Sequence, residues 1–332
     1  MKNSSFLLII LLILFSLEGF GQRVVHRISD DHFEIIIQGS ESVPVRILQV
    51  TDLHLGTVGK WKDDLMSFKR IKRLIEMYDP DIIAVTGDLF TGEKPFGSLL
   101  VAFAVSFFDG LERPWLYTFG NHDPEGGFGR DEIYEVFSES EWGILGFHHG
   151  DSQKKYDYLI DLKRPGEQVP FWQLFAFDSG AEKGFKSIKD DQLDWYREQT
   201  KKTKSIYYRS VRAISFFHIP LIQYQYLIDD KSLTFEGENR EKVYYEEDDG
   251  RVYDTFVEMG NIEATFCGHD HYNNYWGRYK GGIILAYGFI SGEATNYAWA
   301  PGGKLIELPE GEEEIGIKNV QSEIPGNPEK MR

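Results

Sequence analysis

Hydrophobic residues follow two alternating patterns along the first half of the chain. Nearly continuous apolar runs predict buried strands over residues 44–52, 81–88 and 114–121. Apolar residues at helical spacing predict amphipathic helices over residues 61–78, 96–108 and 130–138. Because strands that alternate with helices of this length form βαβ units, we expect a sheet that is buried on both faces.

Strands are more frequent in the rest of the chain. Residues 24–29 and 33–39 predict a short hairpin around Asp30 and Asp31. Further strands are predicted over residues 155–162, 171–179, 211–220, 262–270 and 282–288, with helices near 190–202 and 253–259. The sequence has no repeat of fixed period and no long linker rich in Pro, Gly or Ser. We therefore predict a single α/β domain over residues 23–332, built from two stacked sheets.

The first 22 residues have the layout of a secretory signal peptide. Lys2 precedes an apolar run over residues 6–17, and small residues follow at Gly19 and Gly21. A retained membrane anchor is the alternative, but this run is shorter than the roughly 20 residues that span a bilayer. We expect cleavage near Gly21 or Gln22, and a secreted or periplasmic protein without stable membrane insertion.

Charge and cysteine content narrow the possible functions. A formal net charge of -17 argues against binding to nucleic acid or to an anionic membrane, which requires clusters of Lys and Arg. Cys267 is the only cysteine, so no intramolecular disulfide can form, and its apolar neighbours predict a buried thiol rather than a metal ligand. The acidic stretch 236–249 is interpreted as a solvated loop, with a position over a binding site as the alternative.

Polar side chains of metal-binding type follow five of the predicted strands. They are Asp52 with His54, Asp88, Asn121 with His122, His218, and His269 with His271. Ligands of open α/β sheets bind at the carboxyl ends of the strands, so these loops should converge. Taken alone, each has another explanation: Asp52 could cap a helix, Asp88 could lie in an ordinary turn, and His218 could be a core histidine. Seven or eight such residues on one rim exceed what polar turns would supply.

The donor types indicate two metal ions. Imidazoles, carboxylates and one amide suit Zn, Mn or Fe, whereas a structural zinc site would use cysteines. A single catalytic zinc needs about three protein ligands, so the seven candidates are too many for one ion. Two ions bridged by a carboxylate would account for the surplus.

Taken in order, the motifs are D-x-H at Asp52, G-D at Gly87, G-N-H at Gly120, the lone His218, and G-H-x-H at Gly268. This set resembles the calcineurin-like metallophosphoesterase superfamily, and in particular its purple-acid-phosphatase-like single-domain branch. The resemblance implies a four-layer α/β/β/α sandwich of two mixed sheets. It also implies two ligand sets that share Asp88: Asp52, His54, Asp88 and His271 for one metal, and Asp88, Asn121, His218 and His269 for the other.

The resemblance gives His122 a catalytic role without metal ligation. It implies an enzyme that hydrolyses a small phosphomonoester or phosphodiester by attack of water acidified between two metal ions, with His122 as general acid or charge stabiliser. With the signal-like start of the chain, we expect this enzyme to be secreted. Asp270 and Asp123 are expected to support neighbouring groups, and Asp123 is the candidate partner of His122. Alternatives are a nuclease or cyclic-nucleotide phosphodiesterase using the same site, and a metal-binding scaffold without activity.

One position departs from the patterns of this superfamily. Three residues after the bridging aspartate, purple acid phosphatases have the tyrosine that gives them their colour, and phosphoprotein phosphatases have an aspartate that orients the catalytic histidine. This chain has Thr91 there. We therefore expect a colourless enzyme, and the sequence leaves the partner of His122 open.

Overall fold

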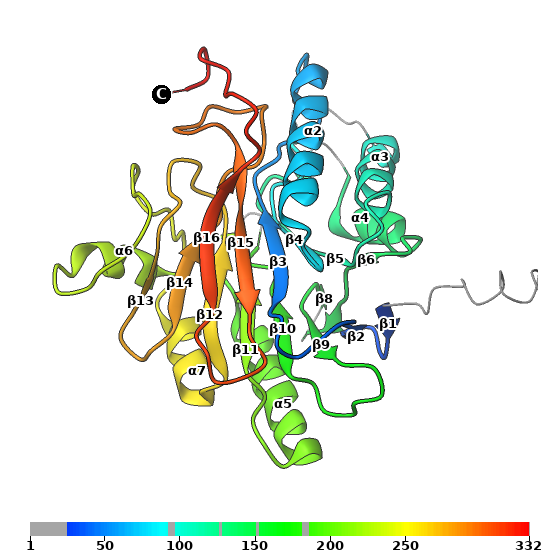
Figure 1. The fold of residues 1–332 in the computed structure, drawn as a ribbon, viewed down its shortest axis with the longest axis vertical. Coiled ribbons are helices and arrows are strands. Elements are labelled where there is room, and N and C mark those ends of the chain that lie inside the picture. The colour runs from blue at the N-terminus through cyan, green and yellow to red at the C-terminus, as the bar shows by residue number, and fades with distance from the viewer. Residues whose placement is uncertain (1–24, 92–96, 126–127, 151–152, 181–185, 332) are drawn as a thin grey trace, which may run out of the picture.

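The computed structural model describes residues 25–91, 97–125, 128–150, 153–180 and 186–331, so the predicted signal peptide lies outside the described residues. Two large mixed sheets pack face to face, and helices cover the outer face of each (Figure 1). The predicted four-layer α/β/β/α sandwich is therefore confirmed. In the described residues, no helix is long and apolar enough to span a membrane.

The first sheet has six strands in the order β16-β15-β3-β4-β5-β6. They are β3 (Val45–Val50), β4 (Ile82–Thr86), β5 (Trp115–Thr118), β6 (Gly143–Ile144), β15 (Gly302–Leu308) and β16 (Gly316–Gln321). Strands β3 to β6 run parallel, and β15 pairs antiparallel with β3. The helices beside this sheet are α2 (Trp61–Tyr78), α3 (Gly97–Asp109) and α4 (Arg130–Phe137), close to their predicted positions.

The second sheet has eight strands in the order β1-β2-β9-β10-β11-β12-β14-β13. They are β1 (Val25–Arg27), β2 (His32–Ile36), β9 (Tyr158–Lys163), β10 (Trp172–Ala176), β11 (Ala213–Phe216), β12 (Ile262–Cys267), β13 (Trp276–Arg278) and β14 (Ile284–Tyr287). The predicted hairpin is the antiparallel pair β1 and β2. Helices α5 (Asp190–Tyr207), α6 (Ile222–Asp229) and α7 (Arg251–Met259) lie on its outer face, and β7 (His148–His149) and β8 (Lys154–Lys155) form a separate ribbon.

Strand β10 shows why the buried strands are continuously apolar. Alternate side chains of a strand point to opposite faces of its sheet. Leu174 accordingly belongs to the apolar cluster between the two sheets, whereas Phe175 belongs to the cluster under the outer helices. Since both faces are covered, every residue of β10 is buried.

The acidic stretch 236–249 only partly fits the predicted solvated loop. Much of it is exposed, but it also packs against the loop that follows β12. The backbone N–H of Tyr244 donates to Asp270 Oδ2 at 3.1 Å, and the side-chain amide of Asn239 donates to Asn273 Oδ1 at 2.9 Å. The alternative, in which this stretch overhangs the loop that carries His269 and His271, therefore describes its position better.

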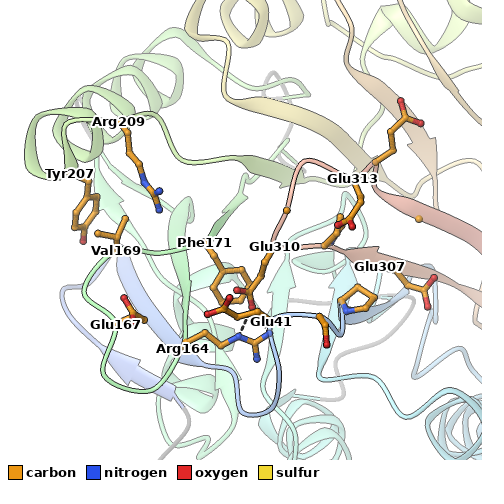
Figure 2. Close-up of a pocket in the computed structure, with 16 residues that line it drawn as sticks. Glu41, Arg164, Glu167, Val169, Phe171, Tyr207, Arg209, Glu307, Glu310 and Glu313 are labelled. Carbon is orange, nitrogen blue, oxygen red and sulfur yellow. Dashed lines mark hydrogen bonds and ion pairs between the residues drawn. The ribbon is translucent and has the colours of Figure 1, made fainter.

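A hollow of about 1080 Å³ lies at the amino ends of the parallel strands (Figure 2). Its walls include Pro44, directly before β3, and Arg164, directly after β9. Arg164 donates to the carbonyl oxygens of Ile37 and Gln38 at 3.1 and 3.0 Å. These bonds tie the segment after β2 to β9, so Arg164 has a structural role at the edge opposite the predicted metal centre.

Candidate metal centre

The predicted metal-binding side chains converge where the carboxyl edges of the two sheets meet. Asp52 and His54 follow β3, Asp88 follows β4, and Asn121 and His122 follow β5, all in the six-stranded sheet. The eight-stranded sheet contributes His218 after β11, and His269 and His271 after β12. Parallel strands within each sheet place these loops along one edge, as the sequence pattern predicted.

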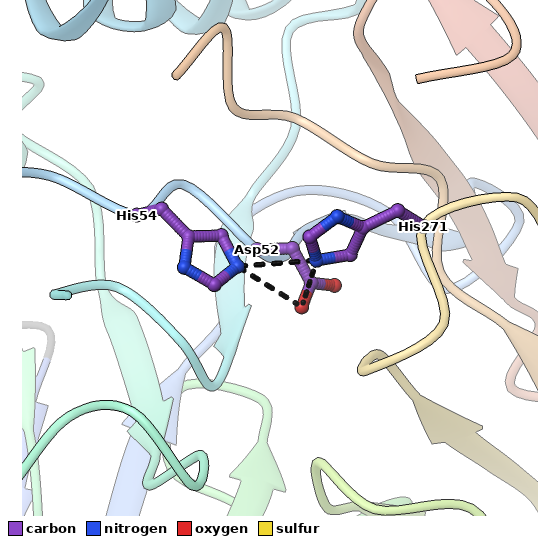
Figure 3. Close-up of side chains that lie close together, drawn as sticks. All are labelled: Asp52, His54 and His271. Atoms are coloured by element: carbon purple, nitrogen blue, oxygen red, sulfur yellow. Dashed lines mark hydrogen bonds and ion pairs between the residues drawn. The ribbon is translucent and has the colours of Figure 1, made fainter. Parts of the chain in front are cut away.

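One group that could hold a metal ion consists of Asp52, His54 and His271 (Figure 3). The Nε2 atoms of His54 and His271 lie 3.1 Å apart, and His271 Nε2 lies 3.5 Å from Asp52 Oδ1. Ligands about 2.1 Å from a shared ion are separated by roughly 3.0 to 3.4 Å. The two distances above are close to this range, and His54 Nε2 lies 4.0 Å from Asp52 Oδ1, so the three side chains need to move together by less than about 1 Å to share one ion.

A second group consists of Asp88, His218 and His269. His218 Nδ1 donates to the carbonyl oxygen of Thr86 at 2.9 Å, because a carbonyl can only accept. This bond leaves Nε2 as the nitrogen that faces Asp88, whose Oδ2 lies 3.1 Å away, and Nε2 is the atom that an ion could contact. Asp88 Oδ2 also lies 3.8 Å from His54 Nε2 of the first group, so Asp88 stands between the two groups.

Two atoms of candidate ligands are buried without a hydrogen-bond partner among the described residues. They are His218 Nε2 and Asn121 Oδ1, and both belong to the predicted ligand set. Leaving such an atom unpaired costs about 1 to 3 kcal/mol, so buried polar atoms nearly always have a partner. A metal ion coordinated by His218 and Asn121 would satisfy both atoms.

The protonation states of the histidines and aspartates in the two groups also favour binding of a cation. Burial lowers the pKa of His54 to about 4, and burial together with the nearby charge of His218 lowers that of His269 to about 3, which favours neutral imidazoles. Burial opposes a charge on His218 as well, yet the Asp88 carboxylate raises its pKa to about 10. Burial also opposes a charge on Asp52 and Asp88, but the neighbouring histidines hold the pKa values of both carboxyls below their usual range, so these two carboxylates carry the negative charge that attracts a cation.

Glycines before the candidate ligands allow the loops to approach closely. A Cβ atom at Gly87 would lie 2.5 Å from the ring of His218, one at Gly120 would lie 2.2 Å from Asp88 Oδ1, and one at Gly268 would lie 2.0 Å from Thr51 Oγ1. Contacts this short leave no space for a side chain. The glycines of the G-D, G-N-H and G-H-x-H motifs are therefore required by packing.

Four of the candidate ligands have left-handed backbone conformations. Their φ angles are 55° for Asp52, 50° for His54, 47° for Asp88 and 79° for His269. This region costs a non-glycine residue of order 1 kcal/mol or more, and such residues cluster at functional sites. The surrounding loops impose these angles. The strain is what we expect where four side chains must be held in fixed positions around a functional site.

His122 lies beside both groups without belonging to either. Its ring centroid is 5.3 Å from that of His54, and its backbone N–H donates to Asp88 Oδ1 at 2.8 Å. Its Nδ1 pairs with Glu125 Oε2 at 2.7 Å, a partner that the sequence analysis missed. The only signal in the sequence is a carboxylate three residues after the histidine, in a segment that contains Pro124.

Asp123, expected to partner His122, instead joins the loops after β4 and β5. Its Oδ2 accepts from the backbone N–H groups of Gly120 and Asp88 at 2.6 and 3.0 Å, and its Oδ1 accepts from that of Phe90 at 2.8 Å. The sequence could not separate Asp123 from Glu125, because the turn decides which carboxylate faces the ring. Asp123 holds the backbone that carries Asp88.

Two residues close to His269 and His271 in the sequence, Asp270 in the same loop and Cys267 at the end of β12, are buried. Asp270 Oδ2 accepts from the hydroxyl of Tyr287 at 2.5 Å as well as from the Tyr244 backbone, and burial raises its pKa to about 7. Cys267 is fully buried among apolar side chains, as predicted. Asp270 therefore braces the loop that carries His269 and His271.

The four-layer α/β/β/α sandwich, with two candidate metal-binding groups where the carboxyl edges of its sheets meet, defines the class as a metallophosphatase-like fold. A family model for calcineurin-like phosphoesterases matches residues 45–273, and the chain belongs to this family. The resemblance drawn from the motifs is therefore confirmed.

Relatives and solved structures are consistent with this assignment. The chain is 28% identical to "Probable inactive purple acid phosphatase 28" of Arabidopsis thaliana over 85% of its own length and 80% of that protein. It is 25% identical to "Phosphatase DCR2" of Saccharomyces cerevisiae, over 72% of its own length and 46% of that protein. A crystal structure of a dimetal phosphatase from Danio rerio has the same fold with a TM-score of 0.59 at 11% identity, covering 84% of this chain and 97% of that one.

Proposed function

We propose that this protein is a secreted dimetal phosphoesterase that hydrolyses small phosphomonoesters or phosphodiesters. The observation that supports this most is the pair of three-residue groups, each of which combines side chains from both sheets and meets the other at Asp88. Secretion rests on the signal-like pattern of residues 1–22. If this segment is cleaved on export, the mature protein begins near Gln22. N-terminal sequencing of the exported protein would check this.

The ligand roles follow from this arrangement. Asp52, His54 and His271 would hold one ion, His218, His269 and Asn121 would hold the other, and Asp88 would contact both. Two bound ions, with Mn, Zn and Fe as candidates, would supply Lewis acidity for the phosphoryl oxygens and for an attacking water. The buried imidazoles and carboxylates of the chain would fix those ions in place.

His122 would move the proton in this reaction. Its side chain is 39% exposed and therefore accessible to a substrate, unlike the buried imidazole of His218. Burial lowers the pKa of His122, but the Asp88 carboxylate and the hydrogen bond to Glu125 outweigh it, so the pKa lies above its ordinary value. A protonated His122 could donate to the leaving oxygen as that bond breaks.

Hydrolysis by two variants tests the proposal. The protein is loaded with Mn or Zn and assayed with phenyl phosphate, p-nitrophenyl phosphate and the bis ester of p-nitrophenol. We expect His122→Ala to lower kcat for phenyl phosphate, whose leaving oxygen needs a proton, by about 100-fold or more while metal content stays the same. Asp88→Asn should lose both metal and activity. If both variants keep wild-type turnover, the assigned site is wrong.

A metal-binding scaffold without catalysis is the second candidate. It is favoured by the names of three Arabidopsis relatives, each of which is called a probable inactive purple acid phosphatase. A scaffold would bind metal at the same residues and hydrolyse neither ester. The complete set of candidate ligands in this chain favours the enzyme, and the assay of the loaded protein separates the two.

A further inference from the structure

Glu125 is the carboxylate that contacts the imidazole of His122. Its Oε2 lies 2.7 Å from His122 Nδ1, and a carboxylate can only accept, so Nδ1 carries the hydrogen. The backbone N–H of Glu125 donates to the carbonyl oxygen of His122 at 3.0 Å and closes a tight turn. The turn holds the carboxylate against the ring from the same short segment.

The backbone of His122 is held independently of its side chain. Its N–H donates to Asp88 Oδ1, while Asp123 binds the N–H groups of Gly120 and Asp88. These bonds fix the position of the main chain, but they leave the imidazole free to rotate. The contact with Glu125 supplies the missing constraint on the ring.

We propose that Glu125 is a positioning residue that holds His122 in the tautomer with hydrogen on Nδ1 and directs Nε2 toward the substrate. This inference rests on the proposed function, because it concerns the proton donor of that reaction. Position 91, where phosphoprotein phosphatases have an orienting aspartate, holds Thr91 in this chain. The orienting carboxylate therefore comes from the turn that carries the histidine.

The His122–Glu125 contact is too exposed to contribute much to folding stability. The side chains of His122 and Glu125 are 39% and 46% exposed, so water competes for both and the pair adds little to folding stability. Its effect is on the orientation and tautomer of the ring. A hydrogen bond of this kind to the second nitrogen is a common way to set which nitrogen of a histidine faces the reaction.

The tautomer of the His122 ring can be measured without an activity assay. Long-range ¹H–¹⁵N spectra of the zinc-treated protein, recorded at alkaline pH where the ring is neutral, distinguish a protonated from an unprotonated nitrogen. We expect His122, assigned by comparison with His122→Ala, to have its hydrogen on Nδ1. In Glu125→Ala the hydrogen should move mainly to Nε2, the form that free histidine prefers. A wild-type ring with its hydrogen on Nε2, unchanged in Glu125→Ala, would overturn the proposal.

Kinetics test the consequence for the reaction. A good leaving group such as p-nitrophenolate needs little protonation, whereas phenolate needs more. We expect Glu125→Ala to lower kcat for phenyl phosphate about tenfold, with a change of less than twofold for p-nitrophenyl phosphate and for KM. Glu125→Gln, which keeps an acceptor oxygen, should recover part of the loss. Glu135→Gln, an exposed glutamate on α4, is the matched control and should behave as wild type.

The two measurements separate the two proposals. If the wild-type protein hydrolyses no ester but its ring tautomer depends on Glu125, the proposed function fails and the contact stands. If the protein is active but phenyl phosphate is cleaved equally well by Glu125→Ala, the positioning role is refuted. Equal losses with both substrates would also refute it, because they would indicate a general structural effect.

Discussion

The contact between Gly120 and Asp88 gives a sharp test of how the loops build the centre. In Gly120→Ala the added Cβ would lie 2.2 Å from Asp88 Oδ1 and 2.3 Å from the Asp88 backbone nitrogen. Both distances are far below any van der Waals contact, so Asp88 must move. The Asp123 carboxylate ties the two loops together and leaves them no room to separate.

The size of the effect follows from this geometry. Overpacking of this kind typically costs about 1 to 3 kcal/mol in stability. A shift of about 1 Å at a reacting group can lower turnover about 100-fold. We therefore expect Gly120→Ala to fold with a modestly lower free energy of unfolding, to lose part of its bound metal, and to lose about 100-fold in kcat.

The assay combines urea unfolding, metal analysis and turnover of p-nitrophenyl phosphate. Gly311→Ala is the control, because its nearest neighbour is the flexible end of the exposed Glu313 side chain, at 3.0 Å. If Gly120→Ala keeps full metal content and a kcat within about twofold of wild type, the close approach of the two loops does not govern the centre. That result would refute the reasoning about the G-N-H glycine.

Two further predictions concern stability. Arg70 is buried and its Nε lies 3.0 Å from Glu293 Oε2. Arg70→Ala should lower the free energy of urea unfolding by about 3 to 5 kcal/mol, because the buried Glu293 carboxylate keeps the Tyr297 hydroxyl but loses its cation. Arg73→Ala, on the exposed side of α2, should change the free energy far less, and equal effects would contradict the argument. Burial raises the pKa of Asp248 from its ordinary value of 3.8 to about 6, so the unfolded chain releases this proton first as the pH rises. Wild-type stability should therefore fall relative to Asp248→Asn between about pH 4 and pH 6, by on the order of 3 kcal/mol, and parallel stability curves would refute this.

Much of the fold was predictable because its strands and helices have distinct apolar patterns. The helix predicted over residues 61–78 has those bounds in α2, and the run over residues 171–179 contains β10, which is buried on both sides. Strands β15 and β16 were not predicted. Their residues are partly polar or glycine. Strand β15 takes its place in the sheet by pairing with β3, from the other end of the chain, and β16 by pairing with β15.

The residues of the candidate site were predictable from the sequence, but the hydrogen bonds that hold them in place were not. Each ligand type follows a strand, and parallel strands bring such positions to one edge. The sequence could not tell Glu125 from Asp123 as the partner of His122, because that depends on the turn. It also could not place the acidic stretch 236–249 over the loop after β12, since contacts such as that of Tyr244 with Asp270 join residues far apart in the chain.

The most direct test of a two-metal centre is anomalous diffraction from crystals grown with manganese. The account predicts two peaks about 3.5 to 4 Å apart, one beside Asp52, His54 and His271 and the other beside His218 and His269, with Asp88 between them. A single peak, or peaks away from these residues, would contradict the central claim.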